Sequence, residues 1–278
     1  MPTTLTEFNA AVERLWPTAF AEAWDAPGLL SGAPDDEVSR VLLAVDAVSA
    51  TVDQAVGTGA DVLLVHHPLL LRGVTSVAET TYKGVLLAKL IRSRCALIAS
   101  HTNADIVDDG TSSVLAGRLG LLEQQPIEAG VRPGTGIGRV GRLAEPTTLG
   151  RLALELGEIL PATGTGVRVS GEFEQPVSTV ALCGGAGDSL LAHPLVRGAD
   201  VYITSDLRHH PASESREQSL LGTGAGGVAG PALVDVSHWA SEWLWLETAA
   251  AQLAEALPEV EFVVSDLRTD PWDFVITQ

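Results

Sequence analysis

The sequence has little cysteine and little basic charge. Only two of the 278 residues are cysteines, Cys95 and Cys183, and they lie far apart, which argues against a disulfide framework and a thiolate zinc site. The 17 basic residues, of which only Lys83 and Lys89 are lysines, face 35 acidic ones, so the formal net charge is −18. This balance argues against a general nucleic-acid surface or an anionic membrane surface.

Long apolar runs are absent as well. No stretch reaches the roughly 18 apolar residues that a transmembrane helix needs. The N-terminal MPTTLTEFNAAVERL carries acidic residues early and has no apolar core typical of a signal peptide. Because 46% of the residues are apolar, the chain can still bury a sizeable core. We expect a cytoplasmic globular protein of one large or two small domains.

What the chain does have is an alternation of short apolar runs with helical patterns, which predicts βαβ units and mostly parallel sheets. The expected strands are 40–46, 61–67, 95–100, 166–170, 178–182, 200–204, 232–236 and 260–264. The expected helices are 4–22, 49–58, 82–93, 110–119, 147–159, 188–192 and 238–255. A stretch rich in proline and glycine from 126 to 138 separates two such blocks. The sequence therefore predicts two α/β domains, with a flexible glycine-rich loop over 222–230.

Histidines and carboxylates gather where predicted strands end, the edge at which open α/β sheets place their sites. His66 and His67 close the strand 61–67, His101 and Asp105 follow the strand 95–100, and His238 and Glu242 follow the strand 232–236. The last pair is four residues apart, so both side chains share one helix face. Imidazole and carboxylate donors without a thiolate suit two divalent transition ions. Each pair taken alone also fits a purely structural role. His66 and His67 could be buried histidines at a loop, Asp105 could cap a loop or helix, and His238 with Glu242 could be a surface ion pair or a capping contact.

Other motifs are weaker. His209 and His210 follow the strand 200–204 and fit substrate binding or proton transfer, but a solvated helix start is favoured for them. His193 precedes Pro194 in a predicted turn. The glycine-rich stretches 134–138, 184–187 and 222–227 match neither a Walker motif nor a dinucleotide fingerprint, and no nucleophile elbow is present.

Taken together, these stretches resemble the GTP cyclohydrolase 1 type 2 homologue family, the Ngg-interacting-factor-three-like dinuclear metal proteins. The resemblance spans nearly the whole chain. It is carried by VDAVSATVDQAVGTGADVLLVHHPLLL (45–71), SHTNADIVDDG (100–110), CGGAGDS (183–189), ADVYITSDLRHH (199–210) and DVSHWASEW (235–243). Ser205 and Ser237 stand where the family usually has glycine.

The resemblance implies a site and an assembly. The residues that match the family's metal ligands are His66, His67, Asp105, His238 and Glu242. His101 matches a histidine that lines the cavity, and His210 one that follows a strand of the second domain. The implied cofactors are two divalent ions per chain, of Zn, Fe, Mn or Ni, in a homohexameric ring. The last strand and helix return to the first domain, so residues 1–128 with 232–278 would carry the ligands and 129–231 would form the second domain.

The resulting hypothesis is a metal-dependent hydrolase in which a metal-bridging hydroxide attacks a small-molecule substrate. Glu242 would bridge the ions, and His101 or His210 would move protons. GTP cyclohydrolase activity is suggested by the family name alone. The alternative is a metal-binding oligomeric scaffold or metal chaperone without catalysis. The acidic net charge argues against nucleic acid as a partner.

Overall fold

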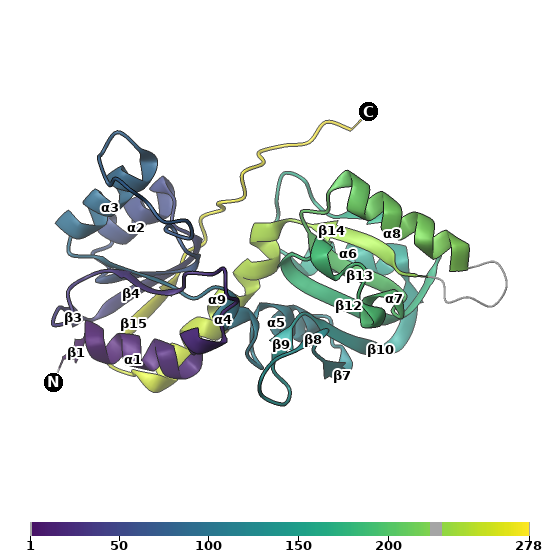
Figure 1. Cartoon of the computed structure of the whole chain (residues 1–278), viewed down its shortest axis with the longest axis horizontal. Coiled ribbons are helices and arrows are strands. Elements are labelled where there is room, and N and C mark those ends of the chain that lie inside the picture. Colours follow the sequence, from purple (N-terminus) through teal and green to yellow (C-terminus); the bar gives the residue numbers. More distant parts are fainter. Residues whose placement is uncertain (1, 223–229, 278) are drawn as a thin grey trace. The chain divides into compact units, whose positions relative to one another are not determined.

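The computed structural model describes residues 2–222 and 230–277, and Figure 1 traces their path. The chain forms two compact units. Unit 1 runs through Ala104 and includes Leu246–Thr269, and unit 2 contains Asp105–Trp245 and the residues from Asp270 onward. Helices and sheets with parallel pairings build both units, so the predicted α/β class is confirmed. Residues 223–229 of the predicted loop 222–230 lie outside the described residues.

Unit 1 is built on a five-stranded sheet with the order β15-β4-β5-β6-β2. Every pairing is parallel except that of β2 with β6. The strands are β2 (Gly28–Ser31), β4 (Arg40–Asp46), β5 (Val62–His67), β6 (Ala96–Ala99) and β15 (Glu261–Val264). The middle strands are almost wholly buried because they are apolar on both faces, as parallel sheets require. The last strand joins this sheet, as the family resemblance implies, and it lies beside β4.

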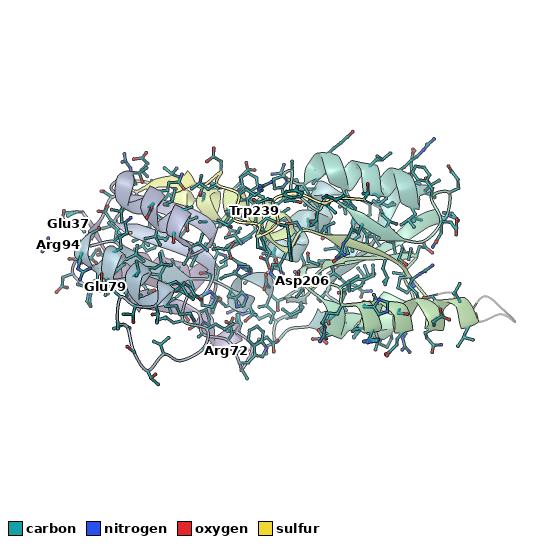
Figure 2. The ribbon with its side chains drawn as sticks, turned by 90° about the horizontal axis from the view of Figure 1, so that it is seen from above. Glu37, Arg72, Glu79, Arg94, Asp206 and Trp239 are labelled. Atoms are coloured by element: carbon teal, nitrogen blue, oxygen red, sulfur yellow. The ribbon has the colours of Figure 1, made fainter. Side chains whose placement is uncertain are left out.

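Helices cover this sheet. The core contains alternate strand residues such as Leu42, Leu63 and Leu97, together with Val52 of α2 (Ser49–Gly57) and Leu90 of α3 (Tyr82–Arg92). Figure 1 shows both helices. Exposed charged side chains, among them Glu37, Glu79 and Arg94, mark the outside of the unit (Figure 2). The elements are β1 (Thr3–Thr4), α1 (Leu5–Leu15), η1 (Thr18–Phe20), β3 (Glu37–Val38), α2 (Ser49–Gly57), α3 (Tyr82–Arg92) and α4 (Thr102–Asp105).

The first helix is shorter than predicted. The sequence predicts a helix over 4–22, but α1 ends at Leu15. Its start is fixed by Thr4, whose side chain accepts a hydrogen bond from the Glu7 amide in a capping box. Its end precedes Pro17, and a proline disfavours helical backbone at the residue before it, here Trp16.

Unit 2 is built on a six-stranded sheet with the order β11-β14-β13-β12-β10-β7. The neighbours β12, β13 and β14 are parallel, and the remaining pairings are antiparallel, so this sheet is mixed. The strands are β7 (Leu122–Gln125), β10 (Arg139–Thr148), β11 (Arg168–Ser170), β12 (Pro176–Ala186), β13 (Val201–Ser205) and β14 (Ala232–Val236), with β8 (Glu128–Ala129) and β9 (Gly136–Ile137) as a separate pair. Residues 184–186 of the glycine-rich stretch 184–187 complete β12, which extends beyond the predicted strand 178–182.

The helices of unit 2 are α5 (Thr111–Arg118), α6 (Leu149–Ile159), η2 (Asp188–Leu190), α7 (Pro194–Arg197), α8 (His209–Gly222) and the first part of α9 (His238–Ala256). Residues of η2, α7 and α8 share one hydrophobic core with Tyr202 and Leu233 of the central strands. The helix α9 begins in unit 2 and ends in unit 1. Within 2–222 and 230–277, no helix combines the length and apolar character needed to cross a lipid bilayer.

The boundaries of the units differ from the predicted domains 1–128 with 232–278 and 129–231. Residues 105–128 and 232–245 belong to unit 2. The reason is clearest for β14, which pairs in register with β13 from Ala232 to Val236 and is buried throughout. Because Asp105, His238 and Glu242 lie in these segments, the predicted ligands are divided between the two units.

Candidate metal centre

Three histidines meet at one edge of the sheet of unit 1. His66 and His67 end β5, and His101 follows β6, its parallel neighbour. One ring nitrogen from each of the three lies within 4.8 Å of the others. The ring centroids of His66 and His67 are 5.0 Å apart. The centroid of His101 lies 5.2 Å from that of His66 and 5.4 Å from that of His67. The sheet therefore assembles the imidazole cluster that the strand ends predict.

Each ring of this cluster is anchored through its Nδ1 atom. His66 Nδ1 lies 2.8 Å from the carbonyl oxygen of Ser100, His67 Nδ1 lies 2.7 Å from Asp46 Oδ1, and His101 Nδ1 lies 2.8 Å from Asp25 Oδ1. A carbonyl or an ionised carboxylate can only accept, so Nδ1 carries the proton and donates it. This leaves the Nε2 lone pair as the electron donor for a cation. A carboxylate or carbonyl behind the ring is the usual outer partner of a metal-binding histidine.

The carboxylates behind these rings are themselves held in place. Asp25 accepts hydrogen bonds from the amide and hydroxyl of Thr102, and its side chain is fully buried. Burial alone raises the pKa of Asp25, but the hydrogen bonds from His101 and Thr102 hold it well below its usual range. Asp46 accepts a hydrogen bond from the Thr269 hydroxyl. Sequence reasoning missed both residues, although Asp46 ends the strand 40–46 at the same sheet edge as His67.

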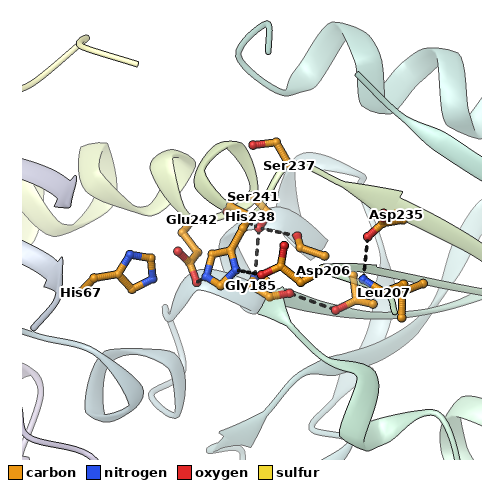
Figure 3. Close-up of polar contacts among 12 residues, drawn as sticks. His67, Gly185, Asp206, Leu207, Asp235, Ser237, His238, Ser241 and Glu242 are labelled. Carbon is orange, nitrogen blue, oxygen red and sulfur yellow. Dashed lines mark hydrogen bonds and ion pairs between the residues drawn. The ribbon is translucent and has the colours of Figure 1, made fainter. Parts of the chain in front are cut away.

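In unit 2, His238 and Glu242 form the predicted pair in the first turns of α9. His238 Nε2 lies 3.1 Å from Glu242 Oε1, and the Glu242 side chain is buried. His238 Nδ1 lies 2.7 Å from Asp206 Oδ2, on the other side of the ring (Figure 3). The helix begins here because the Ser237 hydroxyl accepts a hydrogen bond from the Ala240 amide, as an N-cap serine does.

The two carboxylates change the proton affinity of His238. Burial by itself lowers the pKa of the imidazole, but the negative charges of Glu242 and Asp206 raise it to about 11. Without a bound cation, His238 is therefore protonated at neutral pH. A divalent ion can replace this proton, because it offers the same carboxylates more positive charge.

The end of β12 packs against this pair at Gly185. Its backbone has a φ of +67°, and a Cβ there would lie 2.3 Å from Glu242 Oε1 and 3.2 Å from His238 Nε2. The Gly185 amide donates to Ser241 Oγ at 3.0 Å, which ties the strand end to α9 (Figure 3). Only glycine leaves this space open. The sequence indicates a glycine-rich stretch at 184–187, but nothing in the pattern points to this contact.

Asp105 belongs to the same neighbourhood of unit 2. It ends α4 and accepts a hydrogen bond from the hydroxyl of Thr111 at the start of α5. Burial, with a further contribution from the carboxylates of Asp105 and Glu242, raises the pKa of the Cys183 thiol to about 12. Both acidic side chains therefore act on one buried thiol at the end of β12. Carboxylate oxygens and imidazole nitrogens are ligand atoms that suit divalent transition ions.

The structure thus groups most of the predicted site residues. His66, His67 and His101 meet in unit 1, His238 and Glu242 form a pair in unit 2, and Asp105 belongs to the same unit as that pair. His210 lies exposed at the start of α8 with its ring 5.2 Å from that of His209, and its functional role stays a prediction. His193 caps α7 by accepting a hydrogen bond from the Leu195 amide.

The fold and these clusters define a protein of two α/β units with a candidate metal centre. The family model for Duf34/NIF3 (NGG1p interacting factor 3) matches residues 3–271, and the chain belongs to this family. A relative from Streptomyces coelicolor named GTP cyclohydrolase 1 type 2 homolog is 47% identical, over 96% of this chain and 93% of its own length. A relative of the same name from Mycobacterium tuberculosis is 33% identical, over 98% of this chain and 97% of its own.

Solved structures agree on the fold. A Bacillus cereus protein described as related to NIF3 superposes with a TM-score of 0.88 at 22% identity, over 99% of this chain and all of that one. The Staphylococcus aureus hypothetical protein SA1388 has a TM-score of 0.86 at 26% identity, with the same coverage. The predicted family resemblance is confirmed.

Proposed function

We propose that this protein binds two divalent ions per chain, of Zn, Fe, Mn or Ni, through His66, His67, Asp105, His238 and Glu242, and that it is a metal-dependent hydrolase. The observation that carries the proposal is the anchoring of the imidazoles. His66, His67 and His238 each engage Nδ1 with a carbonyl or carboxylate oxygen. This arrangement presents Nε2 as the ligand atom and resists rotation of the ring.

The proposed ligands differ in what they contribute to the metal centre. The imidazoles supply neutral nitrogen ligands, and Asp105 and Glu242 supply negative charge. When bound, a pair of such ions supplies a Lewis acid and lowers the pKa of water. His101 and His210 are the proposed proton carriers. For His101, the hydrogen bond from Nδ1 to Asp25 fixes the ring and leaves Nε2 to accept a proton, as a general base requires.

The test combines metal counting with a substrate screen. The purified full chain is analysed for metals and then assayed with nucleotides, GTP first because of the relatives' name, with phosphoesters and with cyclic amides. The hydrolase proposal predicts turnover that disappears in His66→Ala and survives in His193→Ala, the matched histidine variant at the α7 cap. A wild-type protein that neither holds nor takes up metal contradicts the proposal.

The second candidate function is that of a non-catalytic metal-binding scaffold, which would require the chain to self-associate. We propose that it forms a homohexamer. Exposed apolar residues in the C-terminal segment support this proposal, because they could form part of an interface between copies. The exposed fractions are 62% for Trp272, 75% for Phe274 and 78% for Ile276. Light scattering at several concentrations tests this, and a 29.0 kDa species throughout contradicts it. Metal binding and assembly without turnover of any substrate would favour the scaffold over the hydrolase.

A cytoplasmic location completes the proposal. Both cysteines, Cys95 and Cys183, are free and buried, which is compatible with a reducing compartment. Fractionation of cells that express the chain tests this location.

A further inference from the structure

Asp206 holds an unfavourable backbone conformation. Among the residues that the structure describes, the non-glycine residues with positive φ are Arg94 and Glu123, both at 54°, and Asp206 at 57°. A Cβ makes this left-handed region costly, and glycine enters it freely. Strain of this kind persists where the surroundings enforce it, and it is frequent at functional sites.

The turn at Asp206 is held by contacts that do not involve its own side chain. Asp206 directly follows β13, which pairs along its whole length with β14. The next amide, of Leu207, donates to Asp235 Oδ1 at 3.2 Å, and Asp235 also forms an ion pair with Arg168 (Figure 3). Glycine would follow this backbone path with less strain. The feature that glycine could not supply is the carboxylate.

That carboxylate meets a proposed metal ligand. Asp206 Oδ2 lies 2.7 Å from His238 Nδ1, although the Asp206 side chain is 61% exposed. On the opposite side of the ring, His238 Nε2 lies 3.1 Å from Glu242 Oε1, where Gly185 leaves space. Holding Nδ1 therefore determines the direction of Nε2.

We infer that Asp206 is a positioning residue for His238: its carboxylate orients the ring so that Nε2 faces the proposed metal position, and the strained backbone at residue 206 is retained for this contact. The inference rests on the proposed function and deepens it. It assigns to Asp206 a role that neither the sequence pattern nor the set of ligands indicates.

The experiment compares Asp206→Gly with Glu123→Gly. Glu123 is a matched control, because it lies in the same unit, has nearly the same positive φ and forms an ion pair with Arg142 away from α9. Both substitutions relieve the backbone and remove one negative charge. The dissociation constant for Zn²⁺ is measured with a competing chelator, the absorption spectrum is recorded with Co²⁺, and melting of the metal-free protein is followed by circular dichroism.

The expected result for Asp206→Gly is a loss of about 10- to 100-fold in Zn²⁺ affinity, the usual size for an outer partner of a metal-binding histidine. The Co²⁺ spectrum should change as well. Glu123→Gly should bind Zn²⁺ within about twofold of wild type. Asp206→Asn keeps an acceptor oxygen and tolerates the backbone, so its loss should be smaller, and it answers the question if Asp206→Gly does not fold.

The outcomes separate the two ideas. Wild-type protein that binds no Zn²⁺ or Co²⁺ overturns the proposed function, and the inference with it. Wild-type protein that binds Zn²⁺, with both Asp206 variants binding equally well, overturns the inference alone. Equal losses in Asp206→Gly and Glu123→Gly also overturn it, because the effect would then be one of net charge.

Discussion

The two donor clusters place their negative charge differently. In unit 1 the carboxylates of Asp25 and Asp46 lie behind the histidine rings, at Nδ1. In unit 2 the ring of His238 has a carboxylate on each side, with Asp206 at Nδ1 and Glu242 at Nε2. The first arrangement orients a ring and leaves its ligand atom facing away from the acid. The second also attracts a cation to the ligand atom.

This difference implies that a proton and a metal ion compete more directly for the ligand nitrogen in unit 2 than in unit 1. Glu242 stabilises any positive charge at His238 Nε2, whether it is a proton or a divalent ion. In unit 1 the carboxylates of Asp25 and Asp46 lie at Nδ1 of the anchored rings, so we expect metal binding there to depend on the orientation of the rings. Substitutions that remove a ligand, block a contact or remove an outer acid should therefore have different consequences in the two clusters.

The largest expected effect is that of His66→Ala. His66 is fully buried, and the variant removes a proposed ligand from the three-histidine cluster of unit 1. Metal affinity should fall by about 100-fold or more, since an inner ligand counts for more than an outer partner. Isothermal titration with Zn²⁺ measures it. His193→Ala is the control, and it should cost about 1 kcal/mol of stability at most, through the lost α7 cap, without altering affinity.

Gly185→Ala should follow, with an effect confined to unit 2. The new Cβ would collide with Glu242 Oε1, and the positive φ adds strain. Gly120→Ala is matched, because Gly120 has a φ of +63° in unit 2 and open space where the Cβ would lie. Both variants should lose about 1 kcal/mol from the backbone. Gly185→Ala should lose about 1–3 kcal/mol more from the collision, as urea denaturation of the metal-free proteins would show. Equal losses would mean that Glu242 moves aside freely.

Asp46→Asn should have a smaller effect, confined to the orientation of His67. The amide can still accept a hydrogen bond from Nδ1 but carries no charge, so Zn²⁺ affinity should fall about tenfold. Asp53→Asn serves as control, because Asp53 pairs with Lys89 on the exposed surface. A surface pair contributes little. If both variants bind Zn²⁺ like wild type, the acid behind His67 does not support metal binding.

The sequence predicts those features of the fold and the site that depend on residues close together in the chain. The strands β4, β5, β6 and β15 of unit 1 follow from apolar runs bounded by turn residues, whereas β2 was not predicted. The cluster of His66, His67 and His101 follows from the shared edge of parallel strands. The strand β10 was not predicted, because apolar residues in Arg139–Thr148 are interrupted by arginine, glycine and proline and its buried residues are confined to one end. Its partners β7 and β12 supply the pairing that the pattern does not indicate.

The outer shell of the site is the part that sequence patterns could not predict. Asp25 and His101 are 76 residues apart, and Asp206 and His238 are 32 apart. Neither separation corresponds to a helix turn or a strand register. These contacts depend on how strand ends and loops approach each other in the folded unit. The pair of His238 and Glu242 was predicted because one helix turn alone determines its spacing.

The measurement that tests the comparison most directly is the pH dependence of the metal-free protein. The pKa of His238 is raised to about 11 in the folded chain, from about 6.5 in the unfolded one. The stabilisation by its carboxylate partners is therefore complete below about pH 6.5 and is lost as the pH rises towards 11. Glu242→Gln lowers the folded pKa, so this variant should lose less stability between pH 7 and 10 than wild type does. With metal bound, stability should instead fall as the pH is lowered, because protons compete with the ion for His238 and favour its release. Melting temperatures of wild type and Glu242→Gln across one pH series, with and without Zn²⁺, measure both arms. Parallel curves for the two metal-free proteins would contradict the assignment of Glu242 as the acid that holds the proton of His238.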